Sequence, residues 1–299
     1  MGEEHSHAGC GKPESMYIGL SPGAIGVRVE NISQRIAAAR DHGFAGVEID
    51  ANEIANLVEA GGAESVTSQF EEADVIACSW GLPTDWRSSE ENWKRDLEKL
   101  PRLAKAAADI GCYRVATWIM PASNDLQFDA NLKFHVERFK PIAEIVGEFG
   151  HRLGLEFVGP KTLRDKFKYE FVYDLPGMMN MANWIGPNVG LLLDSWHLYT
   201  SHGSVAQVLE LHESDVVYVH VNDGPLGVPI DEQLDGVRGL PGETGLINMA
   251  EFLGALKQIG YSGPVIPEPF KKELGDLPDD AARLDTVSAS MRKIFALIE

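Results

Sequence analysis

The chain is organised as eight repeats of one pattern, in which a short apolar run is followed by a polar loop and usually by a longer segment with helical periodicity. The apolar runs are MYIGLS, FAGVEID, DVIACSW, YRVATWIM, RLGLEFVG, VGLLLDSW, VVYVHVND and PVIPEPF. Continuous apolar runs are typical of parallel strands that helices cover on the outside. Because eight such units are enough to close a sheet on itself, we predict a (β/α)8 barrel, the fold class α/β.

The ends of the helical segments support this prediction. Helical segments end just before the next apolar run at four glycines, Gly43, Gly111, Gly150 and Gly260. Glycine is the residue that most often terminates a helix in this way. An open doubly wound sheet would usually carry a glycine-rich phosphate loop after its first strand, and GLSPGAIG matches that fingerprint poorly. We therefore predict a frayed segment over residues 1–15 and one barrel domain over residues 16–299.

Charge and cysteine content exclude several classes of protein. The net charge of −19 argues against nucleic acid as a ligand, because phosphate binding needs clustered Lys and Arg. No segment approaches the roughly 20 apolar residues of a membrane helix, and the N-terminus lacks the apolar core of a secretory signal. The three scattered cysteines are typical of reduced thiols. We expect a cytoplasmic protein with a small-molecule sugar substrate and neither a nucleic-acid nor a membrane partner; a homo-oligomer is left open.

Four consecutive apolar runs each carry one ionisable residue near the carboxyl end. These residues are Glu156, Asp194, His220 and Glu268. Catalytic groups of such barrels lie at the carboxyl ends of the strands, where these four side chains would converge. Three carboxylates in apolar surroundings repel one another and are costly to desolvate, and a divalent cation would offset both effects. Three carboxylates and one imidazole suit Mn²⁺, Mg²⁺ or Co²⁺ better than a structural zinc, so we expect one divalent ion, with Mn²⁺ first and Zn²⁺ as a further alternative.

Other polar and aromatic residues at the strand ends have simpler interpretations. Three acids taken singly are best interpreted as helix caps or members of ion pairs: Glu48, Asp50 and Asp223. His197, three residues after Asp194, is compatible with a packed, hydrogen-bonded histidine. Trp80 ends the third run and Trp118 lies in the fourth, where they are either core residues or contacts to a substrate.

Several longer segments resemble those of a known family. GLEFVGPKTLR, LLLDSWHLY, YVHVNDGP, RGLPGETGLINMAEFL and PEPF are similar to xylose-isomerase-like TIM barrels of the sugar phosphate isomerase and epimerase family. The resemblance covers the chain after residue 16 and is strongest over residues 153–270. It implies that the four residues named above bind one divalent metal. It also implies that His197 and Arg238 contact substrate oxygens, and we expect Trp80, Trp118 and Lys161 to contribute further substrate contacts.

The predicted function is that of a metal-dependent isomerase or epimerase acting on a ketose, an inosose or a related keto-sugar. The cation would polarise a carbonyl and stabilise an enediolate, while Glu156 and Glu268 move the proton and His197 holds an oxygen or assists as an acid or base. Thr244 in PGETG and the long loop LGVPIDEQLDGV depart from the family pattern and leave the substrate open. Because the longer loop leaves room for a larger substrate, the alternative is a lyase or dehydratase acting on a keto-sugar or 3-keto-glycoside. A non-catalytic sugar-binding barrel is disfavoured by the two glutamates.

Overall fold

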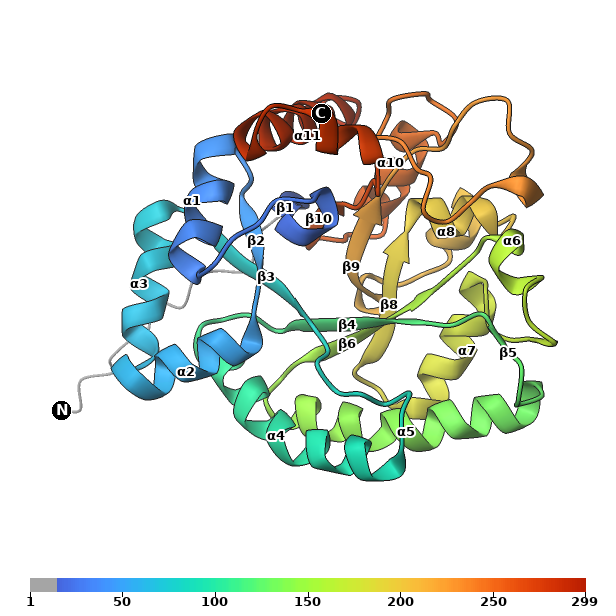
Figure 1. Cartoon of the computed structure of the whole chain (residues 1–299), viewed down its shortest axis with the longest axis horizontal. Coiled ribbons are helices and arrows are strands. Elements are labelled where there is room, and N and C mark those ends of the chain that lie inside the picture. Colours follow the sequence, from blue (N-terminus) through green and yellow to red (C-terminus); the bar gives the residue numbers. More distant parts are fainter. Residues whose placement is uncertain (1–14) are drawn as a thin grey trace.

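The computed structural model describes residues 15–299 and contains a closed barrel of parallel strands in the order β1-β10-β9-β8-β6-β4-β3-β2 (Figure 1). The barrel strands are β1 (Tyr17–Leu20), β2 (Gly46–Ile49), β3 (Ile76–Gly81), β4 (Arg114–Ile119), β6 (Arg152–Phe157), β8 (Val189–Asp194), β9 (Val216–Val221) and β10 (Pro264–Pro267). Each predicted run contains one of these strands, so the predicted (β/α)8 barrel is confirmed. The expected frayed segment lies outside the described residues, apart from residue 15.

Helices surround the barrel (Figure 1). They are α1 (Ile32–His42), α2 (Ala51–Gly61), α3 (Ala63–Ala73), α4 (Glu90–Asp109), α5 (Phe128–Glu148), α6 (Lys161–Arg164), α7 (Leu175–Ile185), α8 (Ser195–Thr200), α9 (Val205–Leu209), α10 (Met249–Gln258) and α11 (Asp280–Phe295). Short 3-10 turns η1 (Pro22–Ile25), η2 (Glu213–Asp215), η3 (Ile230–Glu232) and η4 (Lys272–Asp276) and an antiparallel pair, β5 (Ala122–Ser123) with β7 (Tyr169–Glu170), lie in the connections. Gly43 and Gly260 adopt φ values of 77° and 82°, the left-handed conformation expected of a residue that ends a helix. No helix within residues 15–299 has both the length and the apolar character needed to cross a membrane.

The inside of the barrel is filled by its own apolar cluster. The cluster consists of Tyr17, Cys78, Ala116, Leu192, Val217, Tyr218 and Ile266. Side chains two residues apart on a strand point to the same side. The side chain of Asp194 therefore points to the same side as that of Leu192. In the same way, His220 follows Tyr218 and Glu268 follows Ile266. Apolar side chains thus fill the inside of the barrel, and ionisable groups lie at the carboxyl ends of its strands.

One buried histidine outside the barrel mouth makes folding sensitive to pH. The His135 ring on α5 lies 5.0 Å from the Trp86 ring and 4.7 Å from the Phe171 ring, and only 4% of the residue is exposed. Its Nδ1 atom lies 2.8 Å from the Asn131 carbonyl oxygen. Burial lowers the pKa of His135 to about 4, although the hydrogen bond to this carbonyl oxygen favours the protonated ring.

We expect the free energy of unfolding to fall by about 2 kcal/mol between pH 7 and pH 5 through His135 alone. In the unfolded chain His135 has a pKa near 6.5 and is protonated below that pH, whereas in the folded protein it becomes protonated only near pH 4. The loss therefore begins below pH 6.5 and is complete below pH 4. Urea unfolding of wild type and His135→Phe at both pH values measures it, because other titrating groups are common to the two proteins. Equal pH dependence in both proteins would contradict the assignment.

Candidate metal centre and active site

The four predicted ligands meet at the barrel mouth. Glu156, Asp194, His220 and Glu268 each offer one ligand atom, and these atoms all lie within 4.8 Å of one another. They come from β6, β8 and β9 and from the residue directly after β10. The first three side chains are buried and the fourth is partly buried. Sequence periodicity thus predicted a cluster that the fold assembles from neighbouring strands.

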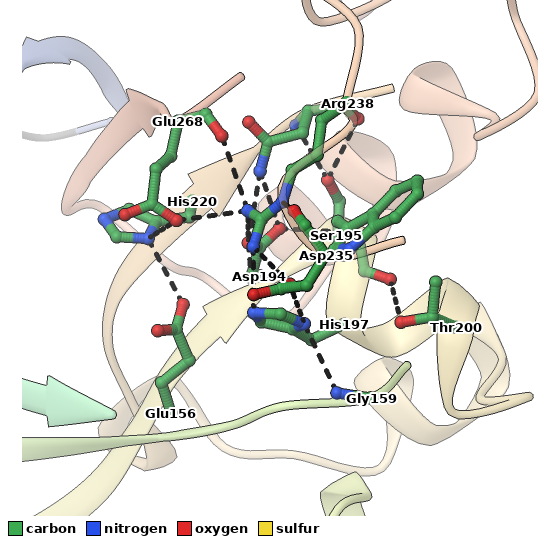
Figure 2. Close-up of polar contacts among 12 residues, drawn as sticks. Glu156, Gly159, Asp194, Ser195, His197, Thr200, His220, Asp235, Arg238 and Glu268 are labelled. Atoms are coloured by element: carbon green, nitrogen blue, oxygen red, sulfur yellow. Dashed lines mark hydrogen bonds and ion pairs between the residues drawn. The ribbon is translucent and has the colours of Figure 1, made fainter. Parts of the chain in front are cut away.

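His220 lies between the two glutamates (Figure 2). Its Nδ1 atom is 3.2 Å from Glu156 Oε1 and 3.4 Å from Glu268 Oε2. Burial lowers the pKa of His220, but the two neighbouring carboxylates outweigh that effect and raise its pKa well above the usual value. Burial raises the pKa of Glu156 to about 7, although the hydrogen bond with His220 opposes the shift. Burial and the close spacing of these ionisable groups therefore set the electrostatics of this site.

Asp194 is held by three groups through four hydrogen bonds. Both of its oxygens lie 3.1 Å from the Asn222 side-chain nitrogen, and Oδ1 accepts the Trp196 N–H at 2.8 Å, which caps α8. Oδ2 accepts from Arg238 Nη1 at 2.9 Å. Burial nevertheless raises the pKa of Asp194. The carboxylate is completely buried and has a fixed orientation.

Arg238 joins the ligand cluster to the long loop after β9. Besides Asp194, its Nη1 atom contacts Glu268 Oε2 at 3.1 Å, and its Nη2 atom donates to Asp235 Oδ1 at 2.8 Å. The pKa of Arg238 is raised: burial lowers it, but the surrounding carboxylates, Asp194 first, outweigh burial. Asp235 was not predicted as a site residue. Its spacing of three residues from Arg238 is the sequence signal that could have indicated it.

His197 is a buried, neutral imidazole next to the cluster. Burial, Arg238 and His220 hold the pKa of His197 well below its usual value. Its Nδ1 atom accepts from the Gly159 N–H at 3.3 Å, and Nε2 lies 3.3 Å from Arg238 Nη2. A neutral imidazole accepts at only one nitrogen, so only one of these contacts is a hydrogen bond at a time. The other nitrogen then carries the proton; in the tautomer in which Gly159 holds Nδ1, that nitrogen is Nε2, which can donate to an oxygen of a bound molecule.

A cavity of about 330 Å³ opens above the apolar cluster. It is lined by Ser21, Gly23, Ala24, Glu48, Ala116, Thr117, Trp118, Glu156, Leu192, Tyr218, His220, Glu268 and Phe270. Of the residues expected to contact substrate, Trp118 is therefore in the wall. Arg238 lines a smaller adjoining hollow of about 180 Å³, while His197 lines neither.

Trp80 and Lys161 lie away from this wall, contrary to the expectation that they contact substrate. Trp80 is completely buried against the helices, with its ring 5.3 Å from that of His151. A register shift opposite Val47 and Glu48 puts one extra residue into β3, which turns Ser79 inward and Trp80 outward. Lys161 is exposed on α6, where its ammonium lies 3.9 Å from Asp231.

The remaining acids at the strand ends divide into two groups. Asp50 caps α2 by accepting the N–H groups of residues 52 and 53, which confirms its interpretation as a helix cap. Asp223 accepts the N–H groups of Thr244 and Gly245 in the loop after β9, a structural role different from the expected helix cap or ion pair. Glu48 instead lines the cavity and accepts from Ser21 Oγ at 3.3 Å, with a pKa raised by burial. Its position two residues after the inward-facing Gly46 is the signal that could have placed it there.

The donor atoms fit a divalent cation. Carboxylate oxygens and one imidazole nitrogen are ligands of hard and borderline divalent metals, and the buried carboxylates outnumber the two cationic groups beside them. Fold and site together therefore define a (β/α)8 barrel with a candidate metal centre at the carboxyl ends of its strands, the face on which such barrels carry their active sites.

The chain belongs to the family of xylose isomerase-like TIM barrels, because the sequence model of that family matches residues 36–294. It is 30% identical to the inosose isomerase of Bacillus subtilis (strain 168) over 154 residues, which is 50% of this chain and 51% of that enzyme. It is 24% identical to the 3-dehydroshikimate dehydratase of Pseudomonas putida over 80% of this chain and 36% of that enzyme. The L-ribulose 3-epimerase of Mesorhizobium japonicum is 25% identical over 82% of this chain and 77% of that enzyme.

Solved structures show the same fold. A xylose isomerase domain protein from Alicyclobacillus acidocaldarius superposes with a TM-score of 0.82 at 29% identity, covering 95% of this chain and 99% of that one. The IolI protein, solved with a bound zinc atom, gives a TM-score of 0.75 at 18% identity, covering 94% of this chain and 98% of that one.

Proposed function

We propose that the protein is a divalent-metal-dependent isomerase or epimerase of a keto-sugar, with Glu156 and Glu268 as the groups that move the proton. The observation that carries the proposal is the placement of these two glutamates at one cavity, on either side of His220 Nδ1 (Figure 2). A chain that only bound a sugar would not require two desolvated carboxylates there. The relatives include an isomerase and an epimerase, which agrees with this chemistry.

Each residue of the site has a defined task in this proposal. Glu156, Asp194, His220 and Glu268 would hold the metal. When bound, the cation would polarise the substrate carbonyl and stabilise the charge that develops when the adjacent carbon loses its proton. One glutamate takes that proton and the other returns one to the same or the neighbouring carbon. His197 Nε2 donates to a substrate oxygen, and Arg238 orients Asp194 and Glu268.

A lyase is the second candidate, and a specific feature favours it. The long loop after β9 carries Asp235 and Arg238 to the site, where the two side chains contact each other. A longer loop can enclose a larger substrate, from which loss of the same proton would be followed by elimination of a leaving group. The similarity to a dehydratase agrees with this alternative.

The deciding experiment follows proton exchange directly. The metal-loaded protein is incubated in D₂O with ketoses, inososes and 3-keto-glycosides, and NMR reports which C–H bond exchanges. An isomerase or epimerase returns deuterium to the sugar carbon, whereas a lyase releases the leaving group. If no C–H bond of any compound exchanges, the catalytic proposal is wrong.

Replacing His197 by Asn should lower turnover by about 10² or more while the protein keeps its metal. The imidazole is not among the four clustered donors, yet its Nε2 atom faces the site beside Arg238. Parallel measurements of kcat and of bound metal test this, with His212→Asn as a control at an exposed histidine. Loss of metal together with activity would place His197 among the ligands instead.

A further inference from the structure

A second and larger cavity lies beside the barrel mouth. It has a volume of about 580 Å³ and is lined by Gly23, Ala24, Ile25, Gly26, Arg28, Phe270, Lys271, Lys272, Leu274, Gly275, Asp280 and Arg283. Its walls are the turn η1 after β1, the segment after β10 and the start of α11. It shares Gly23, Ala24 and Phe270 with the cavity at the candidate metal centre. The two cavities therefore adjoin.

The charge of this second cavity is opposite to that of the protein. Its lining contains four basic residues and one acid, Asp280, whereas the whole chain has 45 acidic and 26 basic residues. A basic cavity on an acidic protein attracts anions to one place and repels them elsewhere. Such a reversal beside a candidate active site indicates a function in recognition of negative charge.

Two of the four basic residues form ion pairs with carboxylates, and the positive charges of the other two are not paired within the described residues. Arg283 donates to the Leu274 and Gly26 carbonyls at 2.8 and 2.9 Å and pairs with Asp280. Lys271 pairs with Glu243 at 2.9 Å. Arg28 and Lys272 are exposed, and neither forms an ion pair with another residue of the described chain. These two side chains therefore have donors available for a ligand.

Phe270 lines both cavities and lies where they meet. Its φ of 40° lies in the left-handed region, which is unfavourable for a bulky residue. The Arg238 guanidinium lies 4.6 Å from the centre of its ring. Because the residue lines both cavities, a substrate that contacts the metal centre and the basic residues must pass along this ring.

We propose that the basic cavity binds an anionic group of the substrate, a phosphate or a carboxylate, at the end remote from the reacting carbonyl. The substrate is then an anionic keto-sugar and not a neutral one. This inference rests on the proposed function for the substrate, but the anion site itself is independent of it. Arginine and lysine are the side chains that bind both anions, arginine through two parallel hydrogen bonds.

The test uses the double variant Arg28→Gln/Lys272→Gln in the metal-loaded protein. Lys99→Gln/Lys105→Gln on α4 removes the same charge from two exposed lysines and is the matched control. Calorimetric titration with inorganic phosphate should give an affinity on the order of tenfold lower in the double variant and unchanged in the control. Phosphate bound to the metal itself would contribute equally to the titrations of the wild type, the double variant and the control variant.

A second measurement compares substrates. The ratio of kcat/KM for keto-sugar phosphates and keto-sugar acids to that for neutral keto-sugars should fall about tenfold in the double variant alone. The class of anion whose ratio falls identifies the group that is bound. Unchanged phosphate affinity would overturn the anion site, and weakened phosphate binding with an unchanged ratio would overturn its role in substrate selection. If no keto-sugar is turned over, the proposed function fails while the phosphate titration still decides on the site.

Discussion

Replacing Asp194 by Asn is expected to lower the affinity for a divalent metal by more than about 100-fold and to abolish turnover. The substitution keeps the size of the side chain but removes one of three clustered carboxylates. Loss of a group that only orients a metal ligand already costs 10- to 100-fold, so loss of a ligand's charge should cost more. Metal content after dialysis against a buffered metal solution measures the effect.

Asp50→Asn is the matched control for this substitution. Asp50 and Asp194 both follow or end a strand and both cap the next helix through their side chains. Asparagine caps helices about as well as aspartate, so both variants should keep their helix and only the effect on metal should differ between them. An Asp194→Asn protein that folds and retains wild-type metal content would remove Asp194 from the ligand set.

If the protein is an epimerase, Glu156→Gln and Glu268→Gln are each expected to lower overall turnover by about 10³, and the pattern of residual exchange should distinguish this reaction from that of a lyase. In an epimerase the proton leaves one face of the substrate and returns to the other. Each variant should then still exchange solvent deuterium into one of the two epimers, because one glutamate remains. In a lyase one base is sufficient, so one variant should be inactive and the other only slowed.

Metal content must accompany these measurements, because both glutamates are also candidate ligands. Glutamine keeps a carbonyl oxygen that can still ligate weakly, which separates loss of the proton carrier from loss of the metal. Glu59→Gln, at a surface ion pair with Arg102, is the control. If both active-site variants keep the metal and wild-type turnover, neither glutamate carries a proton in the reaction, and a sugar-binding protein becomes the better interpretation.

The fold and the ligand cluster could be predicted because both follow from local regularities. Apolar runs at regular intervals predict the strands, and the two-residue repeat of a strand fixes the side to which Asp194 and His220 point. Glu156 and Glu268 lie at the same depth for the same reason. Short-range rules are sufficient when every neighbouring strand obeys them.

Trp80 shows where such rules fail. Counting in twos from Cys78 places its ring at the barrel mouth, but one extra residue in β3 reverses the direction. Pairing with β2 creates this bulge, and no pattern within β3 alone reveals it. The basic cavity was missed for a related reason, because it depends on how segments distant in the sequence meet.

The pairing of β1 with β10 has a consequence for synthesis of the protein. Tyr17 pairs with Pro264, and the Glu268 N–H bonds to Val221 only after β10 has taken its place. A nascent chain can form most of its helices and strands early, but it cannot close the barrel or complete the metal centre until the last strand has left the ribosome. Until then the ends of the sheet have unpaired edges, so the long interval between first and last strand is the stage at which this chain most needs protection from aggregation.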